Sequence, residues 1–101
     1  MPDYIQILRV RPDDGSRDAY RMKEAFVHIY ARAASEAEAA RIMQEYFDRQ
    51  EWTILEVRKA GTIDTSLLPN AKEIRERLET LGYCGDIHYG KPPDDIIFSK
   101  S

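Results

Sequence analysis

The sequence predicts one α+β domain over residues 1–101: a two-layer sandwich whose mostly antiparallel sheet carries two helices on one face. Residues 25–33 alternate between apolar and other side chains, which is typical of a strand. Ser35 and Glu38 then form a capping box, which begins a helix because each side chain satisfies a backbone donor of the other residue. Residues 52–57 are rich in aromatic, β-branched and other apolar side chains and predict another strand. This strand–helix–strand unit indicates the fold class.

The first predicted strand covers residues 4–11, which are rich in branched side chains. Residues 12–16 predict a turn, since Pro12 presets one backbone angle and Gly15 tolerates the left-handed region. The polar residues 17–24 are either a loop or an irregular extension of the second strand. We expect the first two strands to form an antiparallel hairpin.

The first helix is expected to run from Ser35 to about Gln50, since its two ends carry the charges that the helix dipole favours. Glu36 and Glu38 lie in its first turn, and Arg49 lies near its end. Its apolar side chains recur at spacings of three and four and form one stripe: Ala39, Ile42, Met43, Tyr46 and Phe47.

The second helix is expected to begin at Asn70, which forms a second capping box with Glu73. Gly61 ends the strand before it, and residues 62–69 are predicted to be a loop. Gly82 is placed to end the helix in a left-handed conformation. The apolar stripe of this helix is narrower and consists of Ile74, Leu78 and Leu81.

The C-terminal part of the sequence predicts two short strands. Residues 86–89 form one run, and residues 96–98 form a last strand that we expect at an edge. Residues 91–95 between them contain two prolines, which cannot donate backbone hydrogen bonds, so no regular structure is expected there. The predicted order of elements is β-β-α-β-α-β, with the last strand as a further β. This order resembles a ferredoxin-like plait with an added N-terminal strand, a fold that hosts many unrelated functions.

Composition and charge narrow the class of protein. A chain that is 43% hydrophobic and 33% charged is typical of a folded globular domain. The net charge of -3 is small and both signs are interspersed, which gives little basis for nucleic-acid binding. One cysteine, Cys84, allows no internal disulfide and suits a reducing cytoplasm. The N-terminus does not resemble a secretory signal, and no apolar run is long enough to span a bilayer. We therefore expect a cytoplasmic protein that does not contact a membrane.

The second strand carries the main candidate site for a partner. Its small aliphatic residues alternate with Phe26, His28, Tyr30 and Arg32, so the two sets lie on opposite faces. We expect the helices on the aliphatic face, which leaves the other face open. Aromatic and arginine side chains are favoured at protein interfaces. Phe26, Tyr30 and Trp52 are therefore the predicted anchors for a partner, and His28 and Arg32 are predicted to give polar specificity. The alternative is that these residues pack beneath other parts of the chain.

Neither a metal site nor a catalytic site is predicted. His28, His88, Cys84 and Asp86 are acceptable zinc ligands, but their spacing matches no compact ligand motif. Cys84 follows a helix end and is interpreted as a small residue in a turn. The sequence contains no nucleophile elbow, phosphate loop or dinucleotide fingerprint. We therefore predict no catalytic residue and no cofactor, and we favour a protein that is not an enzyme.

Three functions follow from these patterns. The first is a small non-catalytic protein-interaction module that acts through its open sheet face, as a homodimer or on another protein; an immunity-type or antagonist protein is one form. The second is a small-ligand-binding or enzymatic α+β domain, whose pocket lies at a dimer seam and is lined by His28, Tyr30, His88 and Tyr89. The third is a weak nucleic-acid binder that uses the basic residues of the N-terminal hairpin, although acidic residues in the same segment nearly cancel their charge.

Overall fold

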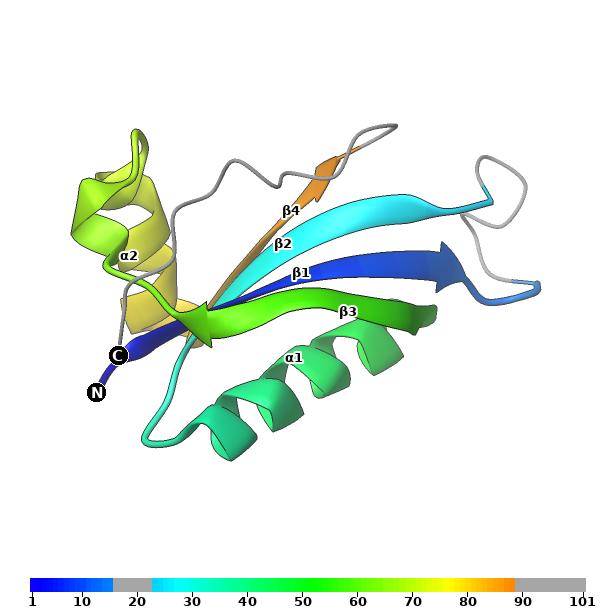
Figure 1. Ribbon diagram of the computed structural model, residues 1–101, viewed down its shortest axis with the longest axis horizontal. Coiled ribbons are helices and arrows are strands. Elements are labelled where there is room, and N and C mark those ends of the chain that lie inside the picture. Colours follow the sequence, from blue (N-terminus) through cyan, green and yellow to red (C-terminus); the bar gives the residue numbers. More distant parts are fainter. Residues whose placement is uncertain (16–22, 89–101) are drawn as a thin grey trace.

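The computed structural model describes residues 1–15 and 23–88 and has an α+β fold (Figure 1). Its strands are β1 (Asp3–Pro12), β2 (Ala25–Arg32), β3 (Trp52–Thr62) and β4 (Tyr83–His88). Its helices are α1 (Glu36–Arg49), α2 (Ala71–Leu81) and the short 3-10 helix η1 (Thr65–Leu67). The predicted strand at residues 96–98, the irregular segment before it and most of the polar stretch at residues 17–24 lie outside the described residues.

The described strands form one four-stranded antiparallel sheet in the order β3-β1-β2-β4. β1 and β2 pair as the predicted hairpin, with Ile7 opposite His28 and Ile5 opposite Tyr30. β2 and β3 both run antiparallel to β1, so they run parallel to each other with β1 between them. The chain passes from β2 to β3 through α1. The ferredoxin-like plait is not confirmed by this order and stays a prediction.

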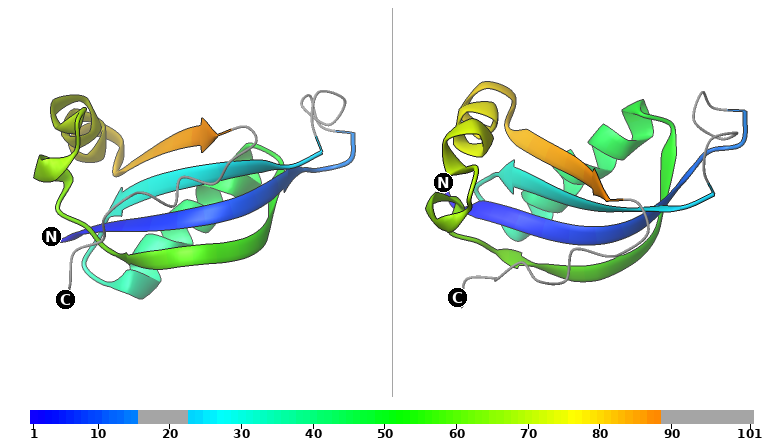
Figure 2. Two further views of the ribbon diagram at one scale, coloured as in Figure 1. Left: turned by 45° about the horizontal axis from the view of Figure 1, so that its top comes forward. Right: turned by 90° about the horizontal axis from the view of Figure 1, so that it is seen from above.

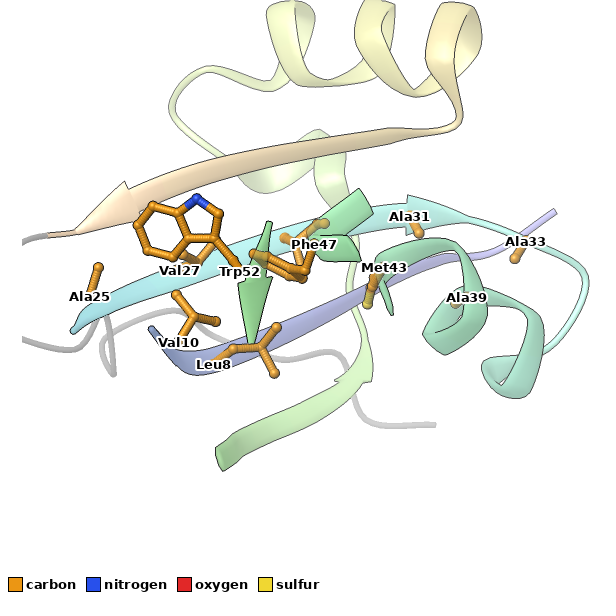
Figure 3. Packing of buried hydrophobic residues seen from close by; sticks show 11 residues of the cluster. Leu8, Val10, Ala25, Val27, Ala31, Ala33, Ala39, Met43, Phe47 and Trp52 are labelled. Carbon is orange, nitrogen blue, oxygen red and sulfur yellow. The ribbon is translucent and has the colours of Figure 1, made fainter. Parts of the chain in front are cut away.

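Helix α1 covers the sheet face that the sequence assigns to the helices. It begins as predicted, because the Ser35 Oγ accepts a hydrogen bond of 3.1 Å from the Glu38 backbone N–H. Its buried side chains, Ala39, Met43 and Phe47, pack on the aliphatic residues of β1 and β2 (Figure 3). This cluster is the larger of the two hydrophobic cores, which we call the α1 core, and it also contains Leu8, Val10, Ala25, Val27, Ile29, Ala31, Ala33 and Trp52.

Helix α2 lies on the opposite face of the sheet, so the prediction that both helices cover one face is wrong (Figures 1 and 2). Its buried residues Ile74 and Leu78 pack on Ile5, Tyr30 and Cys84. Along β2, Tyr30 contacts this second cluster while its neighbours in sequence contact the α1 core, as the alternation of a strand requires. The physical reason is that the face opposite α1 is also apolar at the end of the sheet where Ile5 and Tyr30 lie, so these side chains must be buried by another element.

Strand β4 begins earlier than predicted. The sequence places a turn at Cys84 and a strand from Asp86, whereas the structure forms a strand from Tyr83 directly after the helix. Gly82 makes the short connection possible, because it adopts a left-handed conformation with φ of 83° and its N–H bonds to the Leu78 carbonyl. Cys84 therefore lies within the sheet and pairs with Tyr30.

Among the described residues, no helix is both long enough and apolar enough to cross a membrane.

Candidate functional site

The sheet face opposite α1, which we call the α2 face, brings together four of the five predicted partner-binding residues. Phe26, His28, Tyr30 and Arg32 alternate along β2 on this face, as predicted. Trp52 does not join them, because it is 7% exposed and packs in the α1 core. The five residues therefore do not form one continuous surface.

Most of the predicted anchors on the α2 face are covered. Tyr30 is 2% exposed and His28 is 9% exposed. Phe26 is partly buried, and the guanidinium carbon of Arg58 lies 5.5 Å from the centre of its ring. Arg32 donates hydrogen bonds of 2.8 and 3.3 Å to the two carboxylate oxygens of Asp3. These four side chains therefore offer little exposed apolar surface to a partner that binds the α2 face.

The α2 face instead carries a pocket of about 260 Å³ between α2 and strands β2 and β4, which we call the α2 pocket. The helix stands over one end of the sheet, beside the start of the edge strand β4 (Figure 2). Buried residues form the floor of the pocket: His28, Tyr30, Ile74 and Cys84. Exposed residues form its rim: Asn70, Glu73, Arg77 and Asp86. Such a concave site with a few converging polar groups is the form that small-molecule sites take.

Strand pairing places the polar groups on the sheet side of the α2 pocket. Cys84 lies opposite Tyr30, and Asp86 lies opposite His28. Directly opposed side chains on one face of a sheet are neighbours. His28 Nε2 is 3.7 Å from Asp86 Oδ2, and this contact becomes an ion pair when the imidazole is protonated. The rings of His28 and Tyr30 also meet edge to face, with their centres 5.3 Å apart.

Tyr30, on the floor of the α2 pocket, has a buried hydroxyl group. Within residues 1–15 and 23–88, no group makes a hydrogen bond to its hydroxyl, although the side chain is almost completely buried. Buried tyrosine hydroxyls usually have a hydrogen-bond partner, and an unsatisfied one costs about 1–3 kcal/mol. Burial, with added repulsion from Cys84 and Asp86, raises the pKa of Tyr30 to about 12. The hydroxyl therefore stays protonated at neutral pH and can both donate and accept a hydrogen bond.

Helix α2 supplies the opposite side of the rim. Asn70, Glu73, Ile74 and Arg77 are spaced by three, one and three residues, which places them on one face of the helix. Arg77 lies 3.6 Å from Glu73, but both side chains are more than half exposed, so this ion pair contributes little to stability. The Asn70 side chain makes no capping hydrogen bond, so the prediction of a second capping box at Asn70 and Glu73 is wrong.

The zinc ligands considered from the sequence are only partly brought together. His28, Cys84 and Asp86 all line the α2 pocket. In the part of the chain that the structure describes, no three His, Cys, Asp or Glu residues are arranged to hold a metal ion. His88 ends β4 opposite Phe26, and Tyr89 lies outside the described residues.

Two basic residues of β1 have acidic neighbours. Arg9 lies 3.0 Å from Glu24, and Arg11 lies 3.7 Å from Asp14. Each pair joins opposite charges at the surface, which agrees with a mixed-charge hairpin rather than with a basic stripe for phosphates.

Sequence reasoning found His28 and Tyr30 as candidate pocket residues but missed the rim on α2. The spacing of Asn70, Glu73 and Arg77 was a usable signal, because three polar residues flank the apolar Ile74 on the same helix face. The sequence indicates Asp86 only as an acceptable metal ligand and Cys84 only as a metal ligand or a nucleophile. Comparison with family models, with curated proteins and with solved structures gives no match to this chain.

Proposed function

We propose that this protein is a small-ligand-binding α+β domain whose binding site is the α2 pocket. The observation that carries the proposal is the buried hydroxyl of Tyr30, which lines the pocket and has no hydrogen-bond partner in the described part of the chain. A ligand that bonds to this hydroxyl would satisfy a group that the fold leaves unsatisfied.

The other pocket groups support a binding role for polar molecules. His28 and Cys84 lie beside Tyr30 on the floor, and charged side chains stand at the rim. A volume of about 260 Å³ suits a metabolite-sized molecule rather than a peptide. The pocket is built within one chain, so the proposed site needs no dimer seam.

The test is a nuclear magnetic resonance screen of small polar compounds against the ¹⁵N-labelled full chain. We expect binders to shift the backbone amides of Ile74 and Gly85, which line the pocket from opposite sides. Tyr30→Phe keeps the ring but removes the hydroxyl, so it should weaken these binders about tenfold. Tyr4→Phe is the matched control, because Tyr4 packs against the α1 core. If no compound shifts the pocket amides, or if Tyr30→Phe binds as well as wild type, the proposal is wrong.

A protein-interaction module is the second candidate, and the edge of the sheet favours it. β3 lies at an edge of the sheet formed by the described strands, and its side chains Leu55 and Val57 are 38% and 51% exposed. Edge strands present unpaired backbone groups that can pair with a strand of another chain. Self-association through this edge would give a homodimer. Phe26, which lies on the α2 face, is a further candidate contact for a partner.

Light scattering over a range of protein concentrations tests this second candidate. If β3 forms the interface, wild type becomes dimeric as concentration rises and Val57→Lys stays monomeric. Leu67→Lys is the control, since Leu67 is an exposed apolar residue on η1. A wild-type protein that is monomeric at all concentrations contradicts the homodimer, although a different protein partner is then still to be sought.

The cytoplasm is the compartment we propose, on the basis of the free thiol of Cys84.

A further inference from the structure

The charges around the α2 pocket indicate which class of ligand it binds. Three side chains with fixed charges line the pocket: the carboxylates of Glu73 and Asp86 and the guanidinium of Arg77. Arg77 is already 3.6 Å from Glu73 on the same helix. The carboxylate of Asp86, on the opposite side, lies 3.7 Å from His28 Nε2 and has no cation of Lys or Arg within ion-pair distance among the described residues. With a neutral imidazole, the rim therefore has an excess of one negative charge.

The negative potential reaches the floor of the pocket. Asp86 stands directly across from His28 on β4, next to the pair formed by Cys84 and Tyr30. Burial is the main cause of the raised pKa of Tyr30, and the negative charge of Asp86 adds to it because it disfavours the phenolate. A positive charge placed near this hydroxyl would be favoured for the same reason. The protonated hydroxyl offers its oxygen as an acceptor to an N–H group.

We propose that the α2 pocket binds a small organic amine in its protonated form. Its ammonium group bonds to the Tyr30 hydroxyl oxygen and to the Asp86 carboxylate. An ammonium group carries three donors and no acceptor, which matches two acceptors converging from β2 and β4. An anionic ligand would instead add a second negative charge beside Asp86, and Arg77 already lies 3.6 Å from the Glu73 carboxylate. This inference rests on the proposed function, because it names the ligand class of the same site.

Three probes of nearly the same size and different charge test the inference on the full chain: ethanolamine, ethylene glycol and glycolate. Each is titrated into ¹⁵N-labelled protein, and the amides of Ile74 and Gly85 report on the pocket. We expect ethanolamine to shift these amides and to bind at least about tenfold more tightly than the other two probes. Asp86→Asn should weaken ethanolamine binding about two- to fivefold, because the Asp86 side chain is 63% exposed and solvent screens part of its charge.

Asp14→Asn removes the same charge from the exposed turn after β1 and is the matched control. If its effect equals that of Asp86→Asn, only the net charge matters and the inference is wrong. Glycolate or ethylene glycol binding more tightly than ethanolamine also overturns it, while the proposed small-ligand function stands. If none of the three probes shifts the pocket amides, the amine class is rejected; the proposed function fails only if the wider screen finds no pocket binder either.

Discussion

Arg32 Nε donates a hydrogen bond of 2.8 Å to Asp3 Oδ1, and this contact joins the end of β2 to the start of β1. The Thr65 hydroxyl donates a second bond of 2.7 Å to Asp3 Oδ2. The Asp3 and Arg32 side chains are 10% and 21% exposed, so solvent screens the pair only in part. Asp3 thus links three segments that are distant in sequence. Arg32, predicted as a partner-binding residue, contributes here to the fold itself.

We expect Asp3→Ala to lower the free energy of unfolding by about 1–3 kcal/mol, because it leaves Arg32 and Thr65 without their shared acceptor. Urea denaturation at neutral pH measures the change. Asp14→Ala, in which the lost carboxylate is exposed, should change stability by less than about 0.5 kcal/mol. Equal effects of the two variants would contradict a structural role of Asp3.

The contribution of Asp3 should depend on pH. Burial alone would raise the pKa of Asp3, but the hydrogen bonds from Arg32 and Thr65 outweigh it and hold the pKa below its ordinary value of 3.8. A carboxyl group with a lowered pKa in the folded state adds stability that is complete above its unfolded pKa. This stability is lost as the pH falls through the folded pKa.

The stability difference between wild type and Asp3→Asn should therefore be largest near neutral pH and shrink on acidification below the ordinary value of 3.8. Urea denaturation at a series of pH values measures it. Asp3→Asn in an Arg32→Gln background is the control, since the lowering of the pKa depends first on Arg32 among the hydrogen-bond donors. A difference that grows on acidification would contradict the assignment.

Tyr30→Phe should not destabilise the free protein. It removes a buried hydroxyl that has no partner among the described residues and keeps the ring that packs on Ile74 and Leu78. We expect the free energy of unfolding to stay the same or to rise by about 1 kcal/mol. Tyr30→Ala, in contrast, removes the ring from the core and should cost about 3–5 kcal/mol. A loss of more than about 1 kcal/mol in Tyr30→Phe would show that the hydroxyl has a partner after all.

The two helix N-termini should respond differently to loss of their cap residues. Ser35→Ala removes the hydrogen bond to the Glu38 N–H and should cost about 0.5–2 kcal/mol. Asn70→Ala should cost less than about 0.5 kcal/mol, because the Asn70 side chain makes no capping hydrogen bond. Thermal or urea denaturation of both variants checks the contrast. Equal costs would mean that Asn70 caps α2 in solution.

Trp52 is the only tryptophan, so its fluorescence reports on the α1 core. We expect a blue-shifted emission that acrylamide quenches weakly and that does not change with protein concentration, since the side chain is 7% exposed. Trp52→Ala should lower the free energy of unfolding by about 3–5 kcal/mol. Strong quenching in dilute protein would contradict the packing of Trp52 beneath α1 and would return it to the candidate interface.

The features that the sequence predicted well are those set by local backbone geometry. The start of α1 at Ser35 and the end of α2 at Gly82 follow from a side-chain cap and from glycine conformation, and the expected antiparallel pairing of β1 with β2 is present. The alternation along β2 correctly placed Phe26 and Tyr30 on the face opposite the α1 core. These patterns act over a few residues, so they can be interpreted without knowledge of the rest of the chain.

The α2 pocket could be predicted only in part, because it is formed by residues that are far apart in sequence. The spacing of Ile74 and Leu78 predicts an apolar stripe, and the position of Tyr30 on the face opposite the aliphatic residues predicts that it has either a cover or a partner. The tertiary contacts show that α2 is this cover, from the face opposite α1, and that β4 begins at Tyr83 and so brings Cys84 beside Tyr30. Both faces of the sheet are apolar at that end, so local periodicity leaves the side of the helix open; packing between residues far apart in sequence selects it.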